Sequence, residues 1–115
     1  MSNTILVAVA SKHGLGIDEH FGHAKKFMIY QLTNNQCNLL GTREVEHYCL
    51  GGTSNKPAMG GIIEAIRDCH AVFVVKIGYG PTEILKIVDV RAIYEYAYEE
   101  IEASLLHYYR ELKNG

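Results

Sequence analysis

Two histidines three residues apart are the clearest candidates for chemistry in this chain. His20 and His23 flank the pair Phe21-Gly22, between an apolar run and an alternating run. Imidazole is the commonest metal ligand, and a glycine between two ligands lets the backbone turn so that both face one point. In a tight turn their Cβ atoms would lie about 5–6 Å apart, whereas a strand would point them to opposite faces. The pattern indicates either a metal or cluster site, or a loop with one capping and one solvated histidine.

A second segment, 46–61, which we expect to be irregular, supplies further candidate ligands. It contains His47 and Cys49, followed by Gly51 and Gly52. If both segments lie at the same end of a sheet, imidazoles and one thiolate converge on an open, glycine-lined surface. Thiolate together with imidazole suits iron, iron–sulfur species or zinc.

The other two cysteines are expected in the core. Cys37 and Cys69 fall on faces of a predicted strand and a predicted helix, and a buried free cysteine behaves as a small hydrophobic residue. No CxxC occurs, so neither a ribbon-type zinc site nor a thioredoxin-like motif is encoded.

Two other clusters compete with the histidine pair. Residues 78–82, which include Gly80, form a glycine loop that opens a helix, where backbone N–H groups can hold an anion. An acidic set could instead serve hydrolysis with two magnesium ions; its members are Asp18, Glu19, Glu44 and Glu46. The first predicted strand, 5–10, contains no carboxylate, which counts against hydrolytic chemistry.

Length and charge narrow the classes of protein. The chain has 115 residues, which predicts one domain over 1–115. Its formal net charge of −2 argues against nucleic-acid or anionic-membrane partners held by bulk charge. No apolar stretch approaches the roughly 20 residues that span a bilayer, and no signal-peptide pattern begins the chain. We therefore expect a cytoplasmic protein.

The hydrophobic patterns predict an α/β fold that positions these residues. We expect the order β-β-β-α-β-α-β-α, with an antiparallel first hairpin and parallel right-handed crossovers later. This gives a mixed five-stranded sheet with helices on its faces. The predicted strands are 5–10, 26–32, 37–45 with a bulge at Gly41, 71–77 and 90–94, and the predicted helices are 62–69, 82–88 and 98–113.

Three segments resemble a known family. They are Asp18-Glu19-His20-Phe21-Gly22-His23-Ala24 followed by Phe27-Met28-Ile29-Tyr30, Glu46-His47-Tyr48-Cys49-Leu50-Gly51-Gly52, and Tyr94-Glu95-Tyr96-Ala97-Tyr98-Glu99-Glu100-Ile101-Glu102. Together they resemble the dinitrogenase iron–molybdenum cofactor-binding family of the NifX/NifB type, and look closest to the C-terminal NifX-like domain of NifB. The resemblance covers nearly the whole chain.

The resemblance implies a ribonuclease H-like three-layer fold without nuclease activity. It implies binding and carriage of an iron–sulfur precursor, or of the finished iron–molybdenum cofactor, among the assembly proteins of nitrogenase. The radical-SAM pattern C-x-x-x-C-x-x-C is missing, so we expect no enzyme. Carried onto this sequence, the metal ligands are His20, His23 and Cys49, with His47 a weaker candidate, while Gly51, Gly52 and Gly80 offer N–H groups. A second subunit could complete the site, which makes a homodimer possible.

Two rival functions remain open. In one, the chain is a protein-docking module that binds no cluster and contacts an assembly partner through residues 48–61 and the exposed end of the last helix. In the other, it is an enzyme that acts on a small anionic substrate at residues 78–82.

Overall fold

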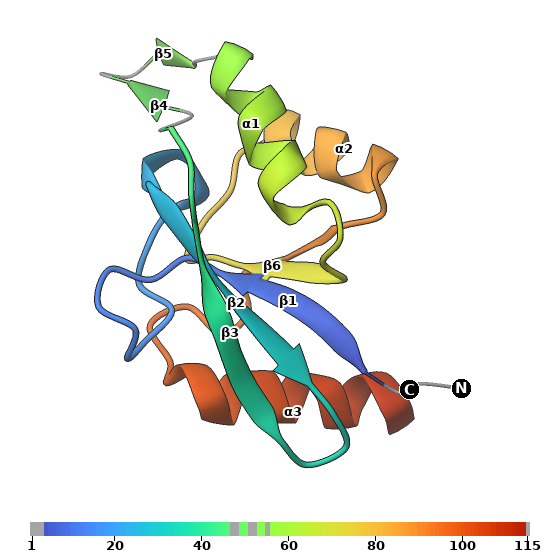
Figure 1. Cartoon of the computed structure of the whole chain (residues 1–115). Coiled ribbons are helices and arrows are strands. Elements are labelled where there is room, and N and C mark those ends of the chain that lie inside the picture. Colours follow the sequence, from blue (N-terminus) through green and yellow to red (C-terminus); the bar gives the residue numbers. More distant parts are fainter. Residues whose placement is uncertain (1–3, 47–48, 51–52, 55, 115) are drawn as a thin grey trace.

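A mixed five-stranded sheet forms the centre of the molecule (Figure 1). The computed structural model describes residues 4–46, 49–50, 53–54 and 56–114. The strand order is β3-β2-β1-β6-β7. The hairpin of β2 (Lys26–Leu32) and β3 (Cys37–Glu44) is antiparallel, and β2 also runs antiparallel to β1 (Ile5–Val9). β6 (Ala71–Phe73) and β7 (Arg91–Ile93) continue the sheet in parallel, so the predicted mixed sheet is confirmed.

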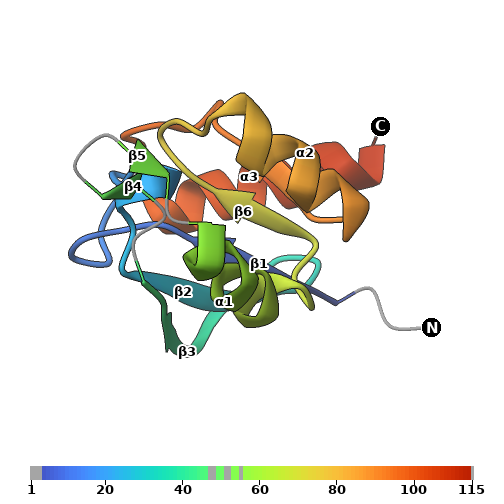
Figure 2. The ribbon, with the colours of Figure 1, turned by 90° about the horizontal axis from the view of Figure 1, so that it is seen from above.

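Helices cover both faces of this sheet (Figures 1 and 2). α1 (Lys56–Ile66) and α2 (Tyr79–Ile87) pack on one face, and α3 (Ile101–Asn114) packs on the other. The alternation of β2 explains the two cores, because Phe27 and Ile29 point toward α1 while Met28 and Tyr30 point toward α3. Within the described ranges, no helix is long and apolar enough to cross a membrane.

The segment between β3 and β6 differs most from expectation. The predicted irregular stretch 46–61 contains a short hairpin of β4 (Cys49–Leu50) and β5 (Thr53–Ser54), and α1 begins at Lys56 rather than at residue 62. The helix therefore includes Gly60 and Gly61, although glycine disfavours helices. Burial of Ala58 and Met59 against the core offsets that preference.

The later elements are shorter or shifted relative to the predictions. β6 ends at Phe73 instead of residue 77, and α2 begins at Tyr79 instead of residue 82. α3 begins at Ile101, not at residue 98, because Tyr98 has a positive φ of 65° and is 70% exposed. The predicted bulge in β3 is confirmed, since Ile29 pairs with Gly41 and Tyr30 with Leu39.

A bidentate ion pair links the edge strand β3 to the residues at the end of α1. Arg43 Nη1 and Nη2 donate to the two carboxylate oxygens of Asp68 at 2.7 and 3.1 Å, and Nη1 also donates to the Ala65 carbonyl at 2.7 Å. The guanidinium lowers the pKa of Asp68. We expect Arg43→Met to reduce the free energy of unfolding by about 1 kcal/mol, a small value because the pair is half exposed.

This stabilisation should be present above the ordinary pKa of a carboxyl and be lost as acid protonates Asp68. Urea unfolding at neutral pH and near pH 3 would measure both effects. Arg67→Met is a suitable control because its ion pair with Glu64 is more exposed. Equal losses in the two variants would contradict the prediction.

A half-buried histidine in contact with α3 should make the stability of the protein depend on pH in a second way. His70 Nε2 lies 3.1 Å from the hydroxyl oxygen of Tyr108, and burial, together with Arg91, lowers the pKa of His70. The unfolded chain therefore binds the proton more tightly, so stability should fall as the pH drops below the ordinary pKa of histidine. We expect His70→Gln to flatten the fall in Tm between about pH 7.5 and pH 5. An unchanged slope would show that other groups cause the fall.

Candidate functional site

His20 and His23 lie together on one short turn. The 3-10 turn η1 (Phe21–His23) follows His20, which is extended, and His23 N–H donates to the His20 carbonyl at 3.1 Å. The two imidazole rings are stacked, with centroids 5.3 Å apart and planes 14° apart. His20 is half-buried and His23 is exposed. The turn therefore presents two ring edges side by side at the surface.

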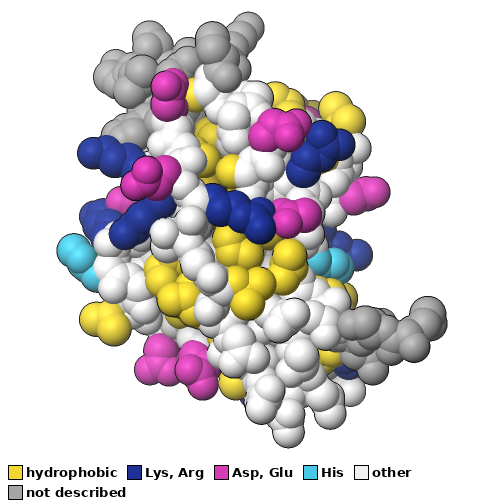
Figure 3. All heavy atoms as spheres, in the orientation of Figure 1, with side chains coloured by type: hydrophobic (Ala, Val, Ile, Leu, Met, Phe, Trp, Pro, Cys, Tyr) yellow, Lys and Arg dark blue, Asp and Glu magenta, His cyan; other side chains and the backbone are white. Residues whose placement is uncertain are grey.

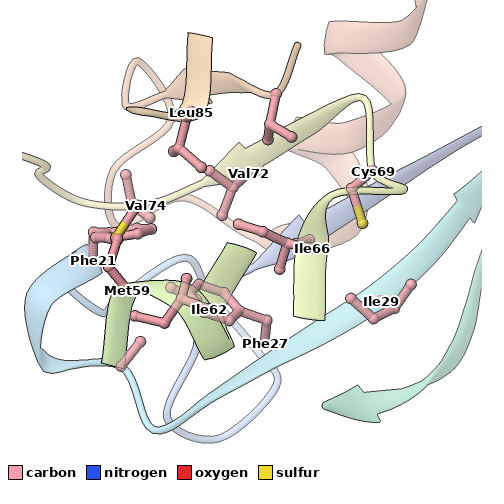
Figure 4. Packing of buried hydrophobic residues seen from close by; sticks show 14 residues of the cluster. Phe21, Phe27, Ile29, Met59, Ile62, Ile66, Cys69, Val72, Val74 and Leu85 are labelled. Carbon is pink, nitrogen blue, oxygen red and sulfur yellow. The ribbon is translucent and has the colours of Figure 1, made fainter. Parts of the chain in front are cut away.

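Phe21 anchors this turn to the hydrophobic core. Its side chain is 1% exposed and its ring centroid lies 6.0 Å from that of Phe27. Figure 4 shows Phe21 among Val74, Met59 and Ile62, so it joins the core that α1 and α2 cover. The residue between the two histidines is thus fixed by packing, which limits the positions open to both imidazoles.

The backbone holds the turn from a second side. Phe21 N–H donates to the Lys76 carbonyl and Val75 N–H donates to the Glu19 carbonyl, each at 2.9 Å. Val74 N–H still donates to the Ile93 carbonyl of β7, but the chain from Val75 onward pairs with the turn, which explains why β6 is shorter than predicted. The sequence does not mark the point where the hydrogen-bond partner changes from the sheet to the turn, because residues 71–77 are mostly apolar throughout.

The two segments predicted to converge do approach each other. β4, whose first residue is Cys49, lies against η1, with Cα atoms of the two elements within 8 Å, and Figures 1 and 2 show them side by side. The backbone of Cys49 is described but its side chain is not. His47, Gly51 and Gly52 fall outside the described residues.

The predicted anion loop 78–82 is largely helical. The helix begins three residues earlier than predicted, so Gly80 lies in its first turn, and the use of its N–H for an anion stays a prediction. The Thr82 hydroxyl donates to the Gly78 carbonyl at 2.7 Å. Pro81 is buried and has no N–H to donate, so it suits the first turn of a helix.

A cavity of about 410 Å³ lies beside the histidine turn. His23 lines it together with three lysines, Lys12, Lys25 and Lys26, and with the carboxylates of Glu19 and Glu44. Lys12 Nζ lies 4.0 Å from Glu19 Oε1. Sequence reasoning missed the lysines because they come from the loop after β1 and from the start of β2.

The remaining candidate ligands play other parts. Asp18 accepts a hydrogen bond from the Lys12 N–H at 2.8 Å, and Glu46 lines a separate cavity with Glu44. Among the residues described, no three His, Cys, Asp or Glu side chains form a group that could hold a metal ion. Cys69 is buried, as expected, and burial raises the pKa of its thiol to about 12. Cys37 is half-buried against the α3 core, and burial raises its pKa to about 11.

Solved structures share this fold. The crystal structure of PH0822 superposes with a TM-score of 0.67 at 15% identity, covering 93% of this chain and 91% of that one. A putative dinitrogenase from Methanocaldococcus jannaschii superposes with a TM-score of 0.59 at 12% identity, covering 94% and 90% of the two chains. At these identities the likeness concerns the fold alone.

Sequence comparison gives the family. The chain is 44% identical over 107 residues to the FeMo cofactor biosynthesis protein NifB of Bradyrhizobium diazoefficiens, and 35% identical over 111 residues to that of Azotobacter vinelandii. These matches cover 93% and 94% of this chain, which spans only about a fifth of each relative. The family model described as dinitrogenase iron-molybdenum cofactor matches residues 3–111, as the three motifs predicted. The chain therefore belongs to the dinitrogenase iron-molybdenum cofactor family.

Proposed function

We propose that this chain binds and carries an iron–sulfur precursor, or the finished iron–molybdenum cofactor, without catalysing a reaction on it. The family, together with NifB relatives that are FeMo cofactor biosynthesis proteins, supports a role in cofactor biosynthesis. The observation that carries the proposal is the stacked pair of His20 and His23 on an anchored turn against β4.

The geometry of the turn suits a large cargo. Two nearly parallel rings with centroids 5.3 Å apart present their edges side by side instead of converging on one point. A preformed cluster offers several iron atoms, so the two imidazoles can bind different ones, and iron accepts both imidazole and thiolate. Few protein ligands also favour release, which a carrier needs.

The ligand set follows the family motif. We propose His20, His23 and Cys49 as ligands, and His47 as a weaker one. The backbone N–H groups of Gly51, Gly52 and Gly80 would donate to cluster sulfides.

We also propose that the fold is ribonuclease H-like and that residues 1–115 act as one domain. Cofactor assembly proteins would deliver or receive the cargo. A reducing cytoplasm suits free thiols and an iron–sulfur cargo, and a second copy of the chain could complete the open site.

Anaerobic titration tests the proposal. Purified protein is mixed with an isolated iron–sulfur cofactor precursor and passed through gel filtration, and optical and EPR spectra are recorded on the protein fraction. We expect the cluster to elute with the protein. A clean apo-protein, with all cluster in the small-molecule fraction, would contradict carriage.

One surface favours the alternative function, a protein-docking module. Tyr79 and Ile87 on α2 are each 81% exposed, and Tyr94 after β7 is 57% exposed. Tyr79 and Tyr94 line a cavity of about 430 Å³ beside α2, whereas most of the predicted docking segment 48–61 has no described side chains. Capture of a cofactor assembly protein that requires Tyr79 and Tyr94, but neither histidine, would favour docking.

A further inference from the structure

The cavity beside the histidine turn carries more positive charge than the chain as a whole. The protein has 11 Lys and Arg against 13 Asp and Glu, a formal net charge of −2. Three ammonium groups and two carboxylates nevertheless line this cavity, together with His23. On the left flank of Figure 3, Lys or Arg side chains lie close together, with acidic side chains between them.

The three lysines differ in their ion pairing. Lys12 lies 4.0 Å from Glu19, so its charge is partly neutralised. In the part of the chain that the structure describes, neither Lys25 nor Lys26 forms an ion pair, and both side chains are exposed. Lys26 stands opposite Glu44 in the β2–β3 register without closing a salt bridge to it.

The fold fixes the backbone that carries these lysines. The Lys25 carbonyl accepts a hydrogen bond from Val45 N–H at 2.7 Å, and Ala24, just before it, is buried. Lys26 is the first residue of β2. Both residues therefore have a well-fixed backbone directly after η1, and their side chains line the same cavity as His23.

We propose that Lys25 and Lys26, assisted by Lys12, form an anion-binding rim that contacts the sulfide or carboxylate surface of the cargo. This inference rests on the proposed function and specifies its substrate as a preformed polyanionic cluster instead of a free metal cation. Iron–sulfur clusters capped by sulfide and thiolate carry net negative charge, which ammonium groups stabilise and which a bare ferrous ion lacks.

The test compares two probes, a synthetic thiolate-capped iron–sulfur cluster and ferrous ion alone, under anaerobic conditions at several salt concentrations. We expect Lys25→Ala/Lys26→Ala to bind the cluster about tenfold more weakly than wild type at low salt, and with a shallower salt dependence. Ferrous ion should bind the variant at least as well as it binds wild type. Glu44→Gln should bind the cluster about threefold more tightly, since it removes a carboxylate from the cavity.

A charge-matched control separates local from global electrostatics. Arg67→Ala/Lys86→Ala also removes two positive charges, from just past the end of α1 and from the last turn of α2, and should leave cluster affinity unchanged. If the Lys25/Lys26 variant matches wild type while His20→Ala/His23→Ala loses the cluster, the rim is refuted and carriage stands. If wild type binds no cluster, both proposals fail.

Discussion

His20→Ala/His23→Ala should abolish retention of the iron–sulfur cargo, and each single replacement should weaken it by about a hundredfold. Loss of residues that only orient a metal ligand typically costs 10–100-fold in affinity, so loss of a ligand should cost at least as much. Neither side chain belongs to the buried core, so the double variant should unfold at nearly the Tm of wild type. Anaerobic gel filtration of the cluster-loaded protein measures retention.

Two exposed histidines elsewhere provide a matched control for this prediction. His13 lies in the loop after β1, and His107 lies on α3, on the opposite side of the sheet from α1. His13→Ala/His107→Ala should retain the cluster as wild type does. Retention by the His20/His23 variant would show that neither imidazole holds the cluster. His20, at the N-cap of η1, makes no side-chain capping hydrogen bond either.

Phe21→Ala should lower the free energy of unfolding by about 3–5 kcal/mol, because it empties a fully buried aromatic site. It should also release the cargo, although phenylalanine cannot bind a metal, since the two imidazoles depend on this anchor for their placement. Urea unfolding measures the first effect, and cluster retention under conditions where the variant remains folded measures the second.

Leu105→Ala separates loss of stability from loss of the site. Leu105 is fully buried in the α3 core, on the face of the sheet away from α1, so its replacement should cost about 2–5 kcal/mol. This variant should still retain the cluster while folded. Phe21→Leu, which refills much of the volume, should restore both stability and retention. Equal cargo loss in Phe21→Ala and Leu105→Ala would show that general destabilisation releases the cluster.

The sheet was predictable because its strands have strong local patterns. The alternation of residues 26–32 gave β2 its correct bounds, and the structure places Phe27 toward α1 and Met28 toward α3, as such alternation requires. The apolar run at residues 5–10 likewise identified the central strand β1. Such patterns can be read from the sequence because the spacing of apolar residues reflects which side chains of a single strand are buried.

The errors occurred where a distant partner decides the local structure. Gly60 and Gly61 suggested an irregular segment, yet tertiary packing of Met59 keeps them in α1. The apolar segment 71–77 was predicted as one strand, but from Val75 onward the chain leaves the sheet to hydrogen bond with Glu19 and Phe21 at the histidine turn. Local helix and strand propensities do not predict either interaction, because both involve residues that are distant in the sequence.

The candidate site was predictable by residue type and only partly by position. The spacing of His20 and His23 suggested a shared turn, and the structure places their rings 5.3 Å apart. Lys25 and Lys26 looked like ordinary surface charge, because only the folded cavity brings them beside His23. Cys49 approaches the turn through its backbone, so its role as a ligand remains a prediction.

Pulsed EPR of the cluster-loaded protein would test imidazole ligation most directly. The protein is prepared with natural histidine and with ¹⁵N-labelled histidine, and the nitrogen hyperfine coupling to the cluster is recorded. We predict a strong coupling that changes with the isotope and is much weaker in any cluster that remains on His20→Ala/His23→Ala, where His47 is the one histidine left among the proposed ligands. A bound cluster without histidine nitrogen coupling would contradict the assignment of this turn as the site that holds the cargo.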